Sequence, residues 1–279
     1  MRAAIRGMIP HSSHPTQPQQ APRAATRLAD TGGDVLDHPI IRALPDEARR
    51  CVETCGTRIQ ALPTETVGAS GKVRFIVSGA VGVFHDTDSA CVAMIGPGGL
   101  QGLEECFLDP IPEEYRVLLN AEWIEVPAVA LADAMGRRWA ERMFAYLAAG
   151  RLRLLAAEAS CNARHPVSQR LARWLLRLHE AAGSPRRLEI TQSLLSEMLG
   201  VQRTTVNAAV GCLHKGGFIK NTRGRITIAD RESLLSASCR CGDGSGPTRT
   251  FSRLDGMTGH GTASGSANDR LPSDHLRRL

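Results

Sequence analysis

Residues 191–228 constrain the fold of this chain more than any other stretch. They read TQSLLSEMLGVQRTTVNAAVGCLHKGGFIKNTRGRITI. Thr191 can cap a short helix, and Gly200 suits the left-handed conformation that ends one. A second helix is expected to begin near Gln202 after a tight turn. The apolar residues of the two helices recur at helical spacing and form one stripe on each; they are Leu194, Leu195, Met198 and Leu199, then Val206, Ala209, Val210 and Leu213.

The residues after this helix pair alternate like two short strands. Phe218 and Ile219 form the first, residues 225–228 form the second, and Gly224 lies at the turn between them. A helix pair followed by such a hairpin predicts a winged helix-turn-helix, which holds one short helix outward to enter the major groove of DNA. An ordinary helical hairpin with a solvated polar face is the alternative.

Polar residues of this segment are of the types that contact DNA. Arg203 can donate two hydrogen bonds to guanine, and Asn207 can pair in a similar way with adenine. Threonine hydroxyls and the amides of a helix start suit phosphates. We predict DNA contacts from Gln202, Arg203, Thr204 and Asn207 in the second helix, and from Lys220, Arg223 and Arg225 in the wing.

Charge divides the chain into two regions of opposite sign. The 279 residues carry a net charge of +6, but residues 34–133 hold 7 Lys/Arg against 16 Asp/Glu, a net of −9. Residues 164–231 hold 12 Lys/Arg against 4 Asp/Glu, a net of +8. An acidic domain followed by a basic one suits a sensor that is joined to a DNA reader.

The acidic region has strand signals at short intervals. Residues 72–77, 81–85 and 91–95 read as strands, with Ser78-Gly79 as a break, and residues 117–120 and 123–126 read as a later hairpin. Many short strands separated by glycine turns predict a roll or barrel over residues 34–133. Helical material is expected on both sides of it.

Two tails flank these regions. Residues 1–33 and 237–279 are rich in small and polar residues and are expected to be disordered. No apolar run approaches the length of a membrane span, and the first thirty residues lack an apolar core of signal-peptide type. We therefore expect a cytoplasmic protein that does not contact a membrane.

Residues 134–163 predict one long helix that joins the two regions. A seam at 4-3-4-3-4 spacing runs along it and predicts a homodimer; it comprises Met143, Leu147, Gly150, Leu154, Ala157 and Cys161. Two paired recognition helices one DNA turn apart would read a palindrome. The alternative is a helix packed on its own roll domain, which requires the same stripe.

The order of roll, long helix and winged helix-turn-helix resembles the Crp–Fnr family of bacterial transcription regulators. The resemblance rests on Val73–Val83, Cys161–Leu176, Leu188–Ile219 and Arg223–Leu234. It implies an α+β fold: an N-terminal, jelly-roll-like β-roll sensor domain of the cyclic-nucleotide-binding type (34–133), a dimerisation helix (134–163) and a C-terminal winged helix-turn-helix (164–236).

The resemblance also implies roles and partners. It makes Arg203 the leading base contact, with Thr204 and Asn207 next, and it places Thr191, Gln192, Ser193 and Thr205 near phosphates. The implied partners are double-stranded DNA with a palindromic operator, a second copy of the chain and RNA polymerase. Thr204 stands where the family often has glutamate, so the operators of well-known members do not carry over.

The residues that bind cyclic nucleotides in the family are incomplete here. The family pairs Gly with Glu for the ribose and Arg with Ser or Thr for the phosphate. In this chain Gly102 is followed by Leu103 and Arg116 by Val117. A buried phosphate needs charge-assisted partners. We therefore predict that cyclic nucleotide binding is absent or weak, with Arg116 the one candidate contact of an unknown small-molecule effector.

Eight cysteines leave a second function open, a redox- or metal-responsive sensor with DNA binding as its output. Cys51-x3-Cys55 with Cys91 or Cys106, or with both, could supply up to four thiolates, but buried apolar cysteines are the favoured interpretation. Cys239 and Cys241 fall in the predicted tail. No cofactor or metal is predicted, with iron–sulfur and haem left open. The sequence contains no P-loop, GxSxG or HExxH motif, so no enzyme is expected.

Overall fold

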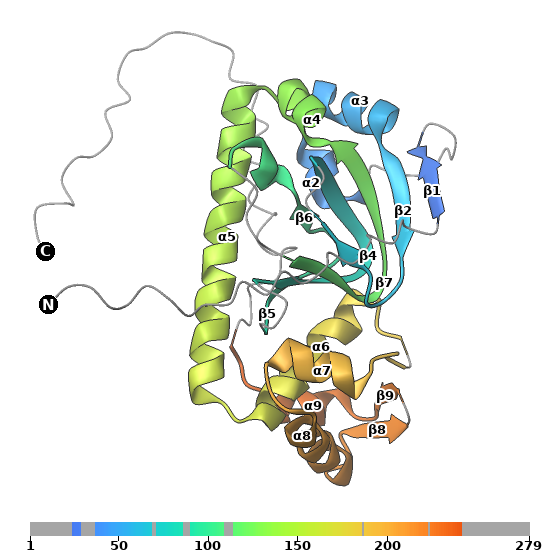
Figure 1. Cartoon of the computed structure of the whole chain (residues 1–279), viewed down its shortest axis with the longest axis vertical. Helices are drawn as coiled ribbons and strands as arrows, with labels where there is room; N and C mark the ends of the chain where they lie inside the picture. Colours follow the sequence, from blue (N-terminus) through green and yellow to red (C-terminus); the bar gives the residue numbers. More distant parts are fainter. Residues whose placement is uncertain are drawn as a thin grey trace, which may run out of the picture.

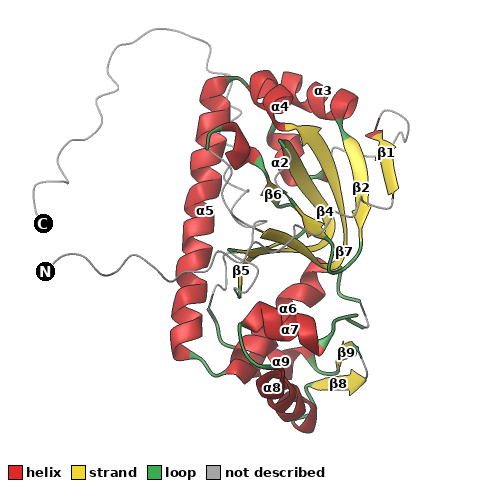
Figure 2. Ribbon diagram, in the orientation of Figure 1, coloured by secondary structure: helices red, strands yellow, loops and turns green. Residues whose placement is uncertain are grey.

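The computed structural model describes residues 24–28, 37–68, 71–85, 90–108, 114–185, 187–222 and 224–241. Figures 1 and 2 show a β-roll in the upper part, the long helix α5 (Arg137–Arg164) down one side, and a small helical domain with a hairpin below. This is the predicted α+β architecture. The predictions for residues 1–23 and 242–279 and for Arg223 lie outside the described residues.

The roll is built on an antiparallel sheet with the strand order β1-β2-β7-β4-β5, in which β3 also pairs with β7 and β6 with β4. Its strands are β1 (Ala24–Arg27), β2 (Thr57–Ala61), β3 (Thr66–Val67), β4 (Lys72–Phe84), β5 (Cys91–Ile95), β6 (Leu100–Gln101) and β7 (Glu114–Pro127). The long central pair β4–β7 supports the whole domain.

Strands β4 and β7 correct the sequence prediction, because each is continuous where a break was expected. β4 runs through Gly79, and its register with β7 shifts between Ile76 and Val81. Gly79 has φ of +77°, and a Cβ there would lie 2.0 Å from the Asn120 carbonyl oxygen. The glycine therefore marks a bulge that bends a long strand, which a sequence pattern cannot distinguish from a turn.

Both faces of the β4–β7 pair are buried, as a closed roll requires. Phe75 and Ile124 pack on one side with the helices α2 (Pro39–Ala43), α3 (Asp46–Cys55) and α4 (Ala128–Met135) and the short 3-10 helix η2 (Leu103–Cys106). Their neighbours Ile76 and Trp123 belong to a separate cluster on the other side. This alternation follows from the two-residue period of a strand.

The lower domain contains α6 (Val167–Ala181), α7 (Gln192–Leu199), α8 (Arg203–Lys215), the hairpin β8 (Ile219–Thr222) and β9 (Arg225–Ile228), and α9 (Arg231–Ala237). Leu188 bridges to Ile226 and extends the hairpin by one pair. The order of these elements is that of the predicted winged helix-turn-helix.

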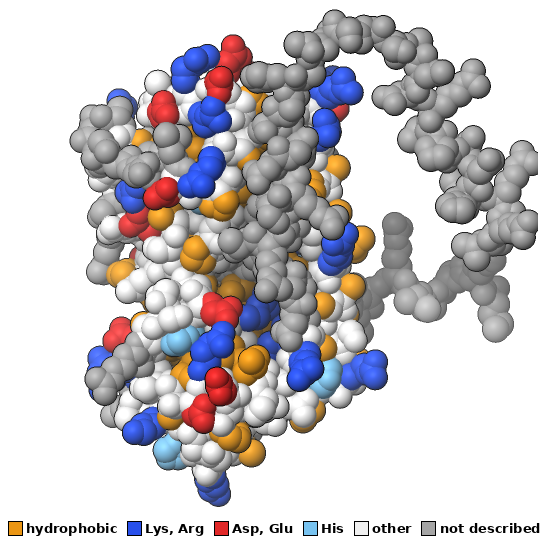
Figure 3. Space-filling model, turned by 180° about the vertical axis from the view of Figure 1, so that it is seen from behind, with side chains coloured by type: hydrophobic (Ala, Val, Ile, Leu, Met, Phe, Trp, Pro, Cys, Tyr) orange, Lys and Arg blue, Asp and Glu red, His pale blue; other side chains and the backbone are white. Residues whose placement is uncertain are grey.

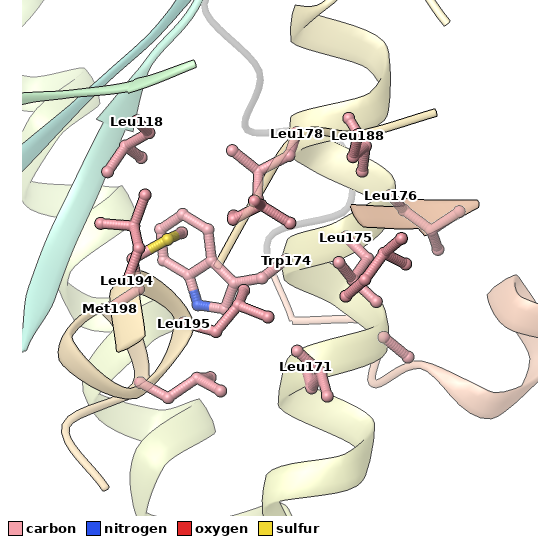
Figure 4. Close-up of a cluster of buried hydrophobic side chains, with 14 of the residues drawn as sticks. Leu118, Leu171, Trp174, Leu175, Leu176, Leu178, Leu188, Leu194, Leu195 and Met198 are labelled. Atoms are coloured by element: carbon pink, nitrogen blue, oxygen red, sulfur yellow. The ribbon is translucent and has the colours of Figure 1, made fainter. Parts of the chain in front are cut away.

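The roll and the lower domain share one apolar core. Trp174 of α6 is buried among Leu194, Leu195 and Met198 of α7, and Leu118 of the roll lies in the same cluster (Figure 4). Packing of side chains, and not a free linker, therefore fixes the orientation of the lower domain against the roll in this structure.

Structure extends into both predicted tails. Residues Ala24–Arg27, within the predicted tail 1–33, pair with β2 as strand β1. At the other end Cys239 is only 4% exposed, and its backbone amide donates to the Gln169 carbonyl oxygen over 3.4 Å. Both segments are held by backbone hydrogen bonds, which do not require a periodic pattern of apolar residues. Composition alone therefore assigned both segments to tails.

Candidate nucleic-acid interface

The two helices of the candidate interface begin and end as predicted. Thr191 Oγ1 accepts a hydrogen bond from the Leu194 amide over 3.2 Å and caps α7. Gly200 ends α7 with φ of +63°, in the left-handed region. A Cβ at Gly200 would lie 2.8 Å from the Ala90 Cβ of the roll, so the turn also packs closely on its neighbour.

The predicted apolar stripes are buried in both helices. Each member is at most 6% exposed: Leu194, Leu195, Met198 and Leu199 in α7, and Val206, Ala209, Val210 and Leu213 in α8. The buried guanidinium of Arg170 donates to the Leu199 carbonyl oxygen over 2.7 Å, so α6 also holds the carboxyl end of α7. The position of α8 is thus set by packing on one face.

The opposite face of α8 is open. Its exposed residues include all those predicted to contact DNA: Gln202, Arg203, Thr204, Thr205 and Asn207. Gln202 is the N-cap residue, and its side chain makes no capping hydrogen bond. The Thr205 amide donates to the Gln202 carbonyl oxygen over 3.0 Å, which leaves the amides of Arg203 and Thr204 as those suited to an anion. Among the residues predicted at phosphates, Thr191 is exposed, and Gln192 and Ser193 are half-buried.

The wing forms as predicted. Residues 219–222 pair antiparallel with 225–228, which buries Ile219 and Ile226 and leaves Lys220 and Arg225 exposed. His214 Nδ1 at the end of α8 lies 3.0 Å from the Ile219 carbonyl oxygen, so the wing is fixed to the second helix.

Some of the positive charge counted in the sequence does not face outward. Arg170 and Arg173 are buried, and Arg177 is half-buried. Glu158 of α5 accepts two hydrogen bonds from Arg173 (2.7 and 2.5 Å) and one from Arg177 (2.9 Å). The basic surface is therefore smaller than a net of +8 indicates, although basic side chains reach the lowest tip of the molecule in Figure 3.

A chain of polar contacts leads from the roll to Arg203. Arg203 Nη2 donates to Ser193 Oγ over 2.5 Å, and Ser193 Oγ donates to Glu197 Oε1 over 3.2 Å. Glu197 Oε2 in turn accepts from Arg116 Nη1 of β7 over 2.5 Å. The predicted effector residue Arg116 and the predicted base contact are thus joined by two intervening side chains.

In the part of the roll where an effector was predicted to bind, the hydrogen-bond donors are paired with carboxylates of the chain itself. Arg116 also donates to Glu114 and lies over the ring of Phe84, 4.5 Å from its centroid. The Glu104 carboxylate accepts from the Gly102 amide over 3.1 Å. Donors that a cyclic phosphate would need are therefore already bonded to carboxylates.

The stripe predicted to pair two protomers faces the rest of its own chain. Met143 is 1% exposed in the roll core, and Cys161 is fully buried against Arg173 and Cys239. Between them Leu147, Gly150, Leu154 and Ala157 are half-buried. Packing within one protomer therefore accounts for the two buried ends of the stripe, Met143 and Cys161, as the alternative expected.

The cysteines gather in a place that sequence spacing did not reveal. Cys51 and Cys55 lie on α3, whereas Cys91 belongs to the core around Trp174, so the four-thiolate set is not brought together. Within the described residues, one group of possible metal ligands converges: Cys161, His165, Cys239 and Cys241. More than seventy residues separate its two halves, which is why local motif searching missed it.

Comparison with known proteins gives a family match for the C-terminal region of the chain. Residues 169–237 match the Crp-like helix-turn-helix domain family. No curated protein sequence matches the chain. None of the described helices is long and apolar enough to cross a membrane.

Solved structures share the fold over most of their length. A crp/fnr-family protein from Eubacterium rectale has a TM-score of 0.58 at 16% identity, covering 71% of this chain and 97% of that one. FixK2 from Bradyrhizobium japonicum has a TM-score of 0.54 at 20% identity, covering 66% and 98%. TTHB099, a CRP-family transcriptional regulator from Thermus thermophilus, has a TM-score of 0.53 at 19% identity, covering 64% and 95%.

Proposed function

We propose that this chain is a sequence-specific, DNA-binding transcription regulator of the Crp–Fnr family and not an enzyme. One observation carries the proposal: Arg203, Thr204 and Asn207 are exposed at the start of a helix whose other face is buried. Such a helix can enter the major groove while its domain supports it from behind.

In this proposal each part of the interface meets a different part of the duplex. Arg203 exchanges its hydrogen bond to Ser193 for two bonds to a guanine edge. Thr191 and the amides of Arg203 and Thr204 bind phosphate oxygens. Lys220 and Arg225 of the wing contact the phosphate backbone beside the groove.

We propose that two copies bind a palindromic operator and that they pair through the exposed face of α5. This face lies opposite the stripe predicted from the sequence, and it also repeats at 4-3-4-3 spacing: Ala145, Ala149, Leu152, Ala156 and Ala159. Leu152 is 69% exposed in the single chain, and with the four exposed alanines it forms a continuous apolar row. Leu152→Glu should give a monomer in light scattering, whereas Arg153→Glu beside it should remain dimeric.

The effector is not a cyclic nucleotide in this proposal, because Arg116 is bonded to Glu114 and Glu197 and Glu104 occupies the Gly102 amide. Calorimetry with cyclic AMP and cyclic GMP should detect no stoichiometric complex in the micromolar range. We propose RNA polymerase as a further partner, which an activator would contact.

The DNA-binding proposal is tested with a duplex that the protein itself selects from a random pool. Arg203→Ala should lose about 1–3 kcal/mol of specific binding and accept more than one base at a single position. Arg137→Ala, at the far end of α5, is the matched control, because it removes one arginine far from the interface. Equal loss on all duplexes would make Arg203 a phosphate contact, and no loss would overturn the proposed interface.

A second function, in which cysteine chemistry controls DNA binding, is favoured by one observation. Three cysteines and a histidine converge where α5 meets the DNA-binding domain. Oxidant-dependent or metal-dependent DNA affinity would support this second function, and affinity unchanged by either treatment would exclude it.

A further inference from the structure

Four side chains meet at the junction between α5, α6 and the segment after α9. Cys161 lies in the last turn of α5, His165 is the C-cap residue of that helix, and Cys239 and Cys241 follow α9. Cys161 Sγ and Cys239 Sγ are 3.4 Å apart, as are Cys241 Sγ and His165 Nδ1. All four ligand atoms lie within 4.8 Å of one another.

We propose that these four side chains bind one Zn²⁺ ion. Zinc in proteins prefers four tetrahedral ligands drawn from cysteine and histidine, at about 2.3 Å to sulfur and about 2.0–2.1 Å to nitrogen. The corners of such a tetrahedron are about 3.5–3.8 Å apart. Two of the separations already lie near this value, and the remaining ones require only small movements of side-chain ends.

The backbone brings the ligands together in two pairs. Cys161 and His165 are four residues apart, so they lie on the same face at the end of α5. Cys239 and Cys241 come from a segment that the backbone hydrogen bond from Cys239 to Gln169 holds against α6. The site therefore forms only when the DNA-binding domain is folded against the long helix.

Charge around the site favours thiolate ligands. Three thiolates and one neutral histidine around Zn²⁺ carry a net charge of −1. Arg173 Nη2 donates to Cys161 Sγ over 3.5 Å, and Glu158 fixes this guanidinium. Cysteine binds zinc as a thiolate, so metal binding must release protons.

Two other uses of the cysteines fit the geometry less well. An iron–sulfur cluster places several atoms between its ligands, and four ligand atoms within 4.8 Å leave room for a single ion. A Cys161–Cys239 disulfide would need an S–S distance of about 2.05 Å and would use only half of the converging group. Neither explains why His165 points at Cys241.

Zinc at this site would tie residues 239–241 to the point where the DNA-binding domain leaves α5. If the proposed DNA-binding function holds, zinc occupancy should also change DNA affinity, because the same junction orients α8. This expectation rests on the proposed function, whereas the zinc site itself does not. Zinc content and DNA affinity are measured separately, so that failure of one proposal is distinguishable from failure of the other.

The test uses the full chain, purified under reducing conditions. Elemental analysis should find one zinc per chain, and Co²⁺ in its place should give the visible absorption of a tetrahedral thiolate site. Cys241→Ser and His165→Ala should each weaken metal binding at least tenfold, whereas Cys212→Ser, an exposed cysteine of α8 outside the group, should leave it unchanged. Circular dichroism checks that each variant is folded.

Three results would overturn the proposal. The first is zinc below a tenth of an equivalent together with a Co²⁺ spectrum like that of free Co²⁺. The second is an unchanged metal affinity in Cys241→Ser, and the third is a Cys161–Cys239 disulfide in the reduced preparation. Zinc that binds stoichiometrically to a chain that does not bind DNA would retain the site and reject the proposed function.

Discussion

Replacing Glu158 by glutamine should destabilise the chain, because this one buried carboxylate is the counter-ion of two guanidinium groups. The side chain of Glu158 is 7% exposed and that of Arg173 is 5% exposed, and the two form a double hydrogen bond. Burial disfavours the charged guanidinium, but the hydrogen bonds and charge of Glu158 outweigh that effect and raise the pKa of Arg173. Both arginines also lie over the ring of Trp174.

The size of the effect follows from what the substitution leaves behind. Glu158→Gln keeps the shape of the side chain but removes its charge, and Arg173 then stays buried without a counter-ion. Breaking a buried pair by removing one partner costs about 3–5 kcal/mol. Arg177 can reach solvent in part, so we expect about 3 kcal/mol, or a fall in Tm of about 6–12 °C for a body of this size.

The assay is urea unfolding followed by circular dichroism, with thermal unfolding beside it. Glu141→Gln is the matched control on the same helix, because Glu141 pairs with Arg137 at the surface, where such pairs contribute less than about 0.5 kcal/mol. A Glu158→Gln variant as stable as the control would refute the reasoning that this ion cluster joins α5 to α6.

The remaining predictions test the turn, the roll and the wing. Gly200→Ala should cost about 1–2 kcal/mol in urea unfolding because of its left-handed φ, whereas Gly211→Ala, in the open interior of α8, should stabilise by about 0.5–1 kcal/mol. Burial lowers the pKa of His38 to about 4, so the unfolded chain binds more protons below pH 6.5. Stability should therefore fall by up to about 3 kcal/mol between pH 6.5 and 4, and His38→Gln should remove that component of the pH profile; identical profiles would contradict this. Lys220→Ala should lower the slope of log affinity against log salt by about 1 on every duplex, and an unchanged slope would remove Lys220 from the phosphate contacts.

The helix-turn-helix was predictable because its determinants are local. Thr191 caps, Gly200 ends the helix, and the apolar residues of α7 and α8 recur at helical spacing, so short-range rules suffice. The exposed row beginning at Gln202 followed from the same periodicity. The wing was predictable for a similar reason, since alternation and a turn glycine lie within ten residues.

Long-range pairing was not predictable in the same way. Gly79 looks like a turn in sequence, but its partner is Asn120, forty residues away, and only the register with β7 reveals a bulge. The stripe of α5 was predictable from its spacing, but the spacing does not identify what the stripe packs against, because a helix packed on its own domain and a dimer helix need the same spacing.

The proposed metal site could not be predicted from the sequence for the same reason, because its ligands are far apart in the chain. Cys161 and His165 have helical spacing, yet nothing local indicates that Cys239 and Cys241 approach them. Composition placed those two cysteines in a tail. A metal site divided between distant segments becomes visible only once the fold brings its halves together.

The most direct test of the central claim is selection of bound sequences from random duplex DNA, with the purified chain at fixed near-physiological salt. We expect a palindromic motif whose half-sites are about ten base pairs apart, because two α8 helices of a symmetric dimer would enter successive major grooves on one side of the duplex. Salt-sensitive binding without any motif, or no binding, under both zinc-loaded and metal-free conditions would contradict the claim that α8 reads DNA sequence.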